Sequence, residues 1–165
     1  MKRVSLWVLV FLLMLCATGC AVGKLMDWVT APLDTPADQV AASLGEYEKE
    51  GFWTHGGFQD FTDFGIYTYS SVSLGENSYF SPVTGEDMDT VRGFIDNYET
   101  WIDTFRRGDP QDELVSHYAF DFSVIDPEDL FYLDYEESSY SKYVNYDLWI
   151  FDSQSKTLYY FHNNI

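Results

Sequence analysis

Both cysteines of this 165-residue chain, Cys16 and Cys20, lie within its first twenty positions. The chain beyond Cys20 therefore has no thiol and cannot form a disulfide bond. A small domain without disulfides must be stabilised mainly by an apolar core. Aromatic residues can supply such a core, because Phe, Tyr and Trp make up 19% of the chain.

The start of the chain has the pattern of an export signal. Lys2 and Arg3 precede an apolar run over residues 6–16. This run is about half of the roughly 20 residues that a transmembrane helix requires. The small residues 17–19 follow it directly before the second cysteine. We therefore expect residues 1–19 to be a signal peptide rather than a stable membrane span.

The stretch Ala17-Thr18-Gly19-Cys20 resembles the lipobox of bacterial lipoproteins, although that family usually has leucine where Ala17 stands. The resemblance implies a diacylglyceryl group joined to Cys20 through a thioether, and cleavage that makes Cys20 the first residue. It also implies a lipid anchor to the cell membrane, with the protein at the extracytoplasmic face. Two acyl chains suffice for lasting attachment, since each buried CH₂ contributes about 0.8 kcal/mol. The alternative is an ordinary secretory signal with an incidental cysteine.

After the signal, residues 20–34 are expected to form a lipidated tether and residues 35–165 a single acidic globular domain. The chain as a whole is similar to small lipoproteins of Gram-positive bacteria, a similarity that assigns no functional residue. Four apolar side chains of the tether could either pack on the domain or rest at the bilayer: Leu25, Met26, Trp28 and Val29.

Acidic residues dominate the charge. Removing residues 1–19 would delete two of the nine basic residues and no acid, leaving 7 basic and 27 acidic residues and a net charge of −20. Such a surface repels nucleic acid and anionic lipid headgroups. We expect no nucleic-acid partner.

Two segments have helical patterns. Thr35 and a proline begin a helix expected over about 36–50. Thr84, with Asp87 as capping partner, begins a second helix whose apolar residues recur in steps of three and four as far as Phe105. A short helical turn is expected over 112–118.

Strand patterns occupy 66–72, 130–135 and a hairpin made of 145–151 and 156–162. Residues 52–65 alternate aromatics with glycines, which favours irregular or edge-strand structure. This order predicts an α+β fold in which two helices pack on a small, mainly antiparallel sheet that ends in a C-terminal β-hairpin.

Signals for catalysis or metal binding are weak. His55, His117 and His162 lack the spacing of a zinc site and are expected to serve as polar partners. The chain has neither a Gly-x-Ser-x-Gly motif nor a glycine-rich phosphate loop. We expect no catalytic residue, no metal and no cofactor.

Carboxylate pairs leave one enzymatic alternative open. Asp60 with Asp63, or Asp126 with Asp129, could form the acid pair of a small hydrolase. With 27 acids in the chain, such pairs also arise by chance. The acids of 86–89 fit the start of a helix better than a calcium loop.

Aromatic residues give the preferred functional hypothesis. Trp53, Phe58, Tyr67 and Tyr69 are candidate binding residues for a carbohydrate or an envelope protein. The alternative is that they belong to the core. We expect a non-enzymatic binding or interaction module; the other candidates are a small envelope hydrolase and an accessory subunit of an envelope complex.

Overall fold

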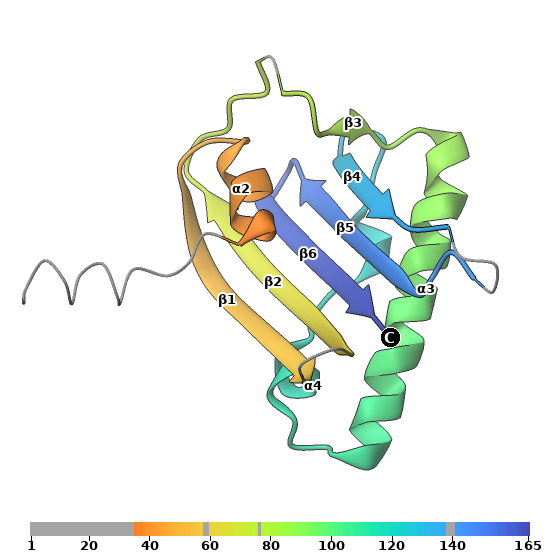
Figure 1. Cartoon of the computed structure of the whole chain (residues 1–165). Coiled ribbons are helices and arrows are strands. Elements are labelled where there is room, and N and C mark those ends of the chain that lie inside the picture. Colours follow the sequence, from red (N-terminus) through yellow and green to blue (C-terminus); the bar gives the residue numbers. More distant parts are fainter. Residues whose placement is uncertain (1–34, 58–59, 76, 138–140) are drawn as a thin grey trace, which may run out of the picture. The chain divides into compact units, whose positions relative to one another are not determined.

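The computed structural model describes residues 35–165 apart from 58–59, 76 and 138–140, so the expected signal peptide (1–19), Cys20 and the expected tether (20–34) lie outside the described residues. Residues 36–165 form one compact unit. Within the described ranges, no helix has the length and apolarity needed to cross a membrane. The elements in chain order are α2 (Pro36–Ala42), β1 (Tyr47–Gly56), β2 (Phe61–Tyr69), β3 (Ser81–Pro82), α3 (Gly85–Gly108), α4 (Glu113–His117), a 3₁₀ turn (Phe122–Val124), β4 (Leu130–Tyr135), β5 (Asn145–Asp152) and β6 (Thr157–Asn164) (Figure 1).

The six strands form one antiparallel sheet in the order β1-β2-β6-β5-β4-β3 (Figure 1). The predicted C-terminal hairpin, β5 with β6, therefore lies at the centre of the sheet. Its central position explains why both strands are buried on both faces. The structure confirms the α+β fold with helices packed on an antiparallel sheet and a C-terminal hairpin.

Each face of the sheet has its own apolar cluster, because successive residues of a strand point to opposite faces. One face packs against α3 and the other against α2. The fully buried side chains of the α3 cluster include Phe64, Val91, Phe94, Tyr98, Leu114, Leu148 and Phe161, and those of the α2 cluster include Ala41, Leu44, Tyr67 and Leu158.

Helix α3 forms as the sequence predicts. The Thr84 side chain accepts a hydrogen bond from the N–H of Asp87, and the Asp87 carboxylate accepts one from the N–H of Thr84, which completes a capping box. Two tyrosines then fasten the helix to the sheet. Tyr98 donates to the carbonyl of Asp63 at 2.7 Å, and Tyr146 donates to the carbonyl of Phe94 at 3.2 Å.

Helix α2 is shorter than the prediction of 36–50, which was wrong beyond Ala42. The chain turns at Gly45, whose φ of +134° is accessible mainly to glycine. Residues 47–50 then join β1, where Tyr47 pairs with Tyr69 and their backbone groups bond across the sheet. The apolar spacing that predicted a longer helix, at 40, 41, 44 and 47, reflects burial on the same face of the sheet.

Strand β1 is an edge strand, so the expectation for residues 52–65 is confirmed only for its first part, 52–56. It was wrong for residues 61–65, which belong to the interior strand β2 and pair with both β1 and β6. The strand predicted over 66–72 is therefore the second half of β2, which ends at Tyr69. The register of β1 with β2 shifts between Lys49 and Gly51, and such irregularities protect an edge from unwanted pairing. The predicted strand at 130–135 has the same bounds in the structure, and the predicted helical turn at 112–118 corresponds to α4.

Candidate functional site

The sheet face that carries α2 is only partly covered by it. Asp38 of α2 accepts a hydrogen bond from the hydroxyl of Tyr67, and the Ala41 carbonyl accepts one from Tyr69. Helix α2, only seven residues long, therefore lies over the part of the sheet near Tyr67. In Figure 1 no helix of the described chain lies in front of the lower parts of β2, β6 and β5.

The strand register divides this face into rows that run across the sheet. The row beside α2 is apolar and consists of Tyr67, Leu158, Phe151 and Leu130. The next row is aromatic and consists of Phe52, Gly65, Tyr160, Trp149 and Tyr132. The third row is polar and consists of Thr54, Asp63, His162, Asp147 and Asp134. We call the aromatic and polar rows together the open sector.

The aromatic row is a continuous series of ring contacts. Phe52 stacks on Tyr160 with ring centroids 5.9 Å apart, and Tyr160 lies 4.9 Å from Trp149. Trp149 in turn stacks with Tyr132 at 5.0 Å, and the exposed Tyr79 meets the Tyr132 ring edge-on at 5.2 Å. The row therefore becomes accessible at its β4 end.

Gly65 allows the stack of Phe52 on Tyr160, because it leaves the space above β2 empty. A Cβ atom at Gly65 would lie 3.2 Å from Cδ2 of Phe52, 3.1 Å from Cε2 of Tyr67 and 3.4 Å from Cβ of Tyr160. These distances are at or below ordinary van der Waals contact, so a side chain here would push the neighbouring rings away.

In the polar row, a histidine lies between two carboxylates. His162 pairs in register with Asp63 on β2 and with Asp147 on β5. Its Nδ1 lies 2.8 Å from Oδ1 of Asp147, and the same oxygen accepts a hydrogen bond of 2.6 Å from Tyr160. This pair of contacts fixes the orientation of the Asp147 carboxylate.

Asp63 is the buried acid of the polar row. Its side chain is buried, with 7% of the residue exposed, and Thr54 provides a hydrogen bond. Burial raises the pKa of Asp63 above 3.8, and the charge of Asp147 adds to this, although Thr54 and His162 oppose it. Oδ1 of Asp63 and Nε2 of His162 are buried and have no hydrogen-bond partner among the described residues. Unsatisfied groups of this kind are rare in proteins and often mark functional sites.

The exposed end of the polar row is strongly acidic. Asp134 and Asp147 face each other directly across β4 and β5, an arrangement that is destabilising for two like charges. A shallow cavity of about 140 Å³ lies here, lined by Asp134, Glu136 and Asp147 together with Tyr135, Asn145 and Tyr146. No group of three acidic, histidine or cysteine residues in the described ranges has the arrangement of a metal site.

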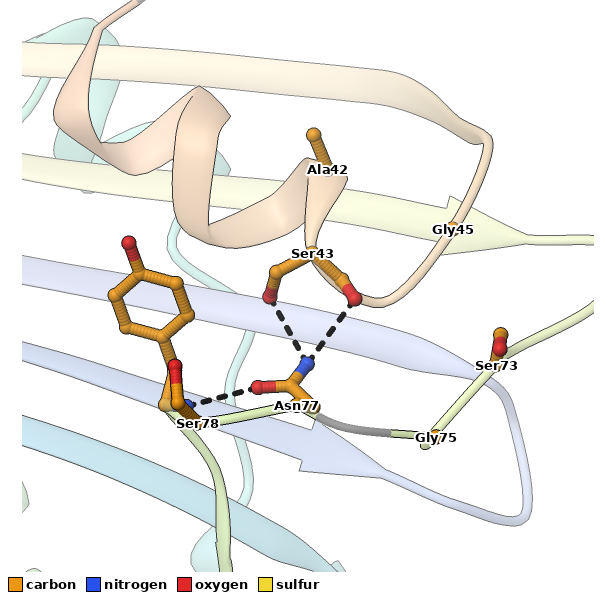
Figure 2. Close-up of a pocket in the computed structure, with 8 residues that line it drawn as sticks. Ala42, Ser43, Gly45, Ser73, Gly75, Asn77 and Ser78 are labelled. Atoms are coloured by element: carbon orange, nitrogen blue, oxygen red, sulfur yellow. Dashed lines mark hydrogen bonds between the residues drawn. The ribbon is translucent and has the colours of Figure 1, made fainter.

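A larger hollow of about 400 Å³ lies between the end of α2 and the segment that follows β2 (Figure 2). Asn77 donates to both the carbonyl and the hydroxyl of Ser43, and its own amide oxygen accepts from the N–H of Tyr79. Figure 2 shows these bonds joining the two segments. The amide of Asn77 is thus used to hold the segment against α2, and none of the described residues that line the hollow is charged.

The other two histidines serve as polar partners, as the sequence predicts. Nδ1 of His55 lies 2.8 Å from Oδ2 of Asp112, which joins β1 to the start of α4. His117 lies 2.8 Å from the Glu113 carbonyl and stacks on Trp53. The cavity beside His55 holds about 220 Å³ and is lined mainly by apolar side chains, including those of Trp101 and Phe105.

The aromatic residues proposed from the sequence do not form one binding surface. Tyr67 and Tyr69 are buried under α2, in agreement with the alternative that they belong to the core. Trp53 is partly buried on the opposite face, against Phe64. Phe58 lies outside the described residues, as does Cys20.

The two proposed carboxylate pairs differ in their surroundings, and the second forms part of a turn. Asp60 is exposed, whereas Asp63 is buried in the open sector. Asp129 is fully buried and accepts from the N–H groups of Asp126 and Ser153, so it stabilises a turn. The pairing of Asp63 with Asp147 across His162 was missed, because these residues are far apart in the sequence. A signal for it was present in the sequence, because alternate residues of β5 and β6 point to the same face of the sheet. That shared face can be recognised only once the register of the strands is known.

Comparisons with protein-family models, with curated proteins and with solved structures give no significant match to this chain.

Proposed function

We propose that this chain is a lipid-anchored protein of the extracytoplasmic face of the cell membrane and acts as a non-enzymatic interaction module. The anchor is the diacylglyceryl group expected at Cys20, since a basic start, a short apolar run and small residues precede this cysteine. The binding surface is the open sector, at its β4 end.

The observation that supports this proposal most directly is the accessible β4 end of the two rows. Tyr160, Trp149 and Asp63 are buried, with 6%, 3% and 7% of each residue exposed. At the β4 end, however, Tyr132 is partly exposed, the neighbouring Tyr79 is 40% exposed, and Asp134 is exposed beside them. Aromatic residues edged by polar groups are typical of interaction surfaces.

The geometry favours binding over hydrolysis. The cavity at the acidic end of the open sector holds only about 140 Å³, and the larger hollow of about 400 Å³ lies beside α2, away from the carboxylates of the polar row. Ligand pockets of enzymes usually hold 300–1,000 Å³ and enclose most of the ligand. The one buried acid of the row, Asp63, is closed off from this cavity by its burial.

Two measurements test the proposal. Mass spectrometry of the native protein should find diacylated Cys20 at the N-terminus; an unmodified cysteine or an intact signal would refute the anchor. Affinity capture from membranes should then recover the same partner with the full wild-type chain but much less with Tyr79→Ala. Recovery that is unchanged both by Tyr79→Ala and by Tyr132→Ala, a change within the open sector itself, would refute the binding surface.

A hydrolase is the second candidate, and the Asp63–His162–Asp147 row is the observation that favours it. An acid with a raised pKa near a second, only partly exposed carboxylate is compatible with a general acid and its partner. Hydrolysis of a cell-wall glycan by the full chain, abolished by Asp63→Asn, would support this candidate and refute the non-enzymatic proposal.

A further inference from the structure

We infer that the hollow between the end of α2 and the segment after β2 is a binding site for a neutral saccharide (Figure 2). This inference rests on the proposed function, because Tyr79 lines the hollow and also ends the aromatic row. It names the class of ligand that this surface takes. The side chains that would contact the sugar are those of Ser73, Ser78 and Tyr79.

The hollow has the size of a small sugar site. Its volume of about 400 Å³ lies within the range of about 300–1,000 Å³ that ligand pockets usually hold. It equals the space of roughly thirteen water molecules at ~30 Å³ each, and a hexose has about twelve non-hydrogen atoms. Ser73, Ser78 and Tyr79 are exposed, so the hollow is accessible from solvent. One sugar unit therefore fits, and a longer glycan can continue outside.

Hydrogen bonds hold the walls of the hollow in place without a ligand. Asn77 donates to the carbonyl of Ser43 at 3.1 Å and to its hydroxyl at 3.0 Å (Figure 2). The amide oxygen of Asn77 accepts from the N–H of Tyr79 at 2.9 Å. The N–H of Ser73 donates to the carbonyl of Leu44 at 2.9 Å. The segment after β2 is therefore joined to the end of α2 at two points, and a preformed site loses less conformational entropy on binding.

Three hydroxyl groups of the hollow have no hydrogen-bond partner among the described residues, namely those of Ser73, Ser78 and Tyr79. Each of them can both donate and accept, as a sugar hydroxyl can. The hydroxyl of Ser43 is different, because it donates to the carbonyl of Val40 at 2.6 Å. The three free hydroxyls are left to water or to a ligand with hydroxyl groups of its own.

The ring of Tyr79 offers a surface on which a sugar ring can stack. Tyr79 is 40% exposed, and its one ring contact in the described chain is with Tyr132, edge-on at 5.2 Å. Such a contact uses the edge of one ring and one face of the other, so at least one face of Tyr79 is not covered by it. The C–H groups of a sugar ring carry partial positive charge and are attracted to the negative face of an aromatic ring.

The lining of the hollow favours a neutral sugar over a charged or an apolar ligand. None of the described residues that line it is charged, so they offer no counter-ion to a phosphate or an ammonium group. The net charge of −18 also repels anions. An apolar ligand would cover the serine hydroxyls without replacing their hydrogen bonds to water, which costs free energy. A ligand with several neutral hydroxyl groups avoids both costs.

The test uses the full chain in a detergent without sugar headgroups. Four probes are titrated by saturation-transfer NMR at low salt: the methyl pyranosides of glucose, galactose, mannose and N-acetylglucosamine. At least one should show saturable binding in the millimolar range. The 6-phosphate of that glycoside, and benzyl alcohol as an apolar ring, should bind at least tenfold more weakly. Absence of binding by all four glycosides, or equal binding of the phosphate or of benzyl alcohol, would overturn the inference.

Matched tyrosine variants locate the site. Tyr79→Ala should weaken binding of the glycoside at least tenfold, whereas Tyr79→Phe, which keeps the ring, should weaken it less. Tyr135→Ala is the control, because Tyr135 is 39% exposed but does not line the hollow. This variant should bind the glycoside as wild type does. Equal effects of Tyr79→Ala and Tyr135→Ala would overturn the inference, and so would unchanged binding by Tyr79→Ala. Near-ultraviolet circular dichroism confirms that each variant is folded.

The same variants separate this inference from the proposed function. The Cys20→Ser chain should bind the glycoside normally, so failure of the lipid anchor leaves the sugar site intact. If no glycoside binds but capture of a partner still depends on Tyr79, only the saccharide inference fails. If a glycoside binds through Tyr79 but capture of a partner is unchanged by Tyr79→Ala and Tyr132→Ala, only the proposed interaction surface fails.

Discussion

His162 hydrogen-bonds to Asp147 on one neighbouring strand, at 2.8 Å, while Asp63 on the other neighbouring strand is buried with an unsatisfied oxygen. The imidazole is therefore bound asymmetrically between two carboxylates in register. This asymmetry makes Asp63 a source of instability at neutral pH, and a comparison of variants can measure it.

Replacing Asp63 with asparagine should stabilise the protein at pH 7. Burial raises the pKa of Asp63 in the folded state, so folding favours the protonated form and charged Asp63 costs stability. Asparagine is neutral and can still bond to Thr54. We expect a gain of roughly 1 kcal/mol at pH 7, the scale of one poorly satisfied buried polar group. Thermal unfolding of the full chain would measure it.

The pH dependence of that gain provides the control. Below pH 3.8 the carboxyl is protonated in both folded and unfolded chains, so the advantage of Asp63→Asn should vanish there. A gain that is constant from pH 3 to pH 7 would contradict a charge effect.

Gly65→Ala should destabilise the protein by about 1–3 kcal/mol, the usual cost of overpacking. The new Cβ would lie 3.1 to 3.4 Å from Tyr67, Phe52 and Tyr160 and would disturb their stacking. Denaturant unfolding and near-ultraviolet circular dichroism would report both effects. Gly57→Ala is the matched control, because its Cβ meets no atom within 4 Å. Equal losses of stability in the two variants would mean that replacing a glycine, and not crowding of the neighbouring rings, causes the loss.

Tyr98→Phe should cost about 1 kcal/mol, because it removes the hydroxyl that joins α3 to the carbonyl of Asp63 and leaves that carbonyl short of a donor. Tyr146→Phe, which removes the reciprocal bond to Phe94, should cost a similar amount. Tyr135→Phe is the control, since this tyrosine is 39% exposed. Urea unfolding would rank the three variants by their free energy of unfolding. A loss of stability in Tyr135→Phe as large as in Tyr98→Phe would contradict a specific role of the Tyr98 hydrogen bond.

Asp112→Asn should make the free energy of unfolding depend less on pH at acid pH. Burial alone would raise the pKa of Asp112, but hydrogen bonds from His55 and from the N–H of Val115 outweigh it and lower the pKa below 3.8. The carboxylate therefore adds stability above pH 3.8, and this contribution is lost as pH falls through the lowered pKa. The difference in free energy of unfolding between wild type and variant should be constant well above pH 3.8 and should shrink as the pH falls below 3.8. A difference that stays constant below pH 3.8 as well would show that the N-cap bond alone matters.

The helix α3 and the strands β4, β5 and β6 could be predicted because their signals are local. Thr84 and Asp87 are three residues apart and cap the helix without help from the rest of the chain. The end of α2 could not be predicted, because residues 40–47 satisfy a helical pattern and a sheet face equally well. Pairing of Tyr47 with Tyr69, twenty-two positions away, decided in favour of the strand.

The sequence by itself determined the absence of disulfides after Cys20, the excess of acids, the α+β class and the long capped helix, since each depends on composition or on residues within a few turns of one another. The export signal is also a prediction from the sequence alone. Only the tertiary structure decided which side chains meet on one face of the sheet. His162, Asp63 and Asp147 are up to 99 positions apart and become neighbours through strand register. A shift of one residue in that register would turn every side chain of a strand to the other face, so the site exists only once the whole sheet has paired.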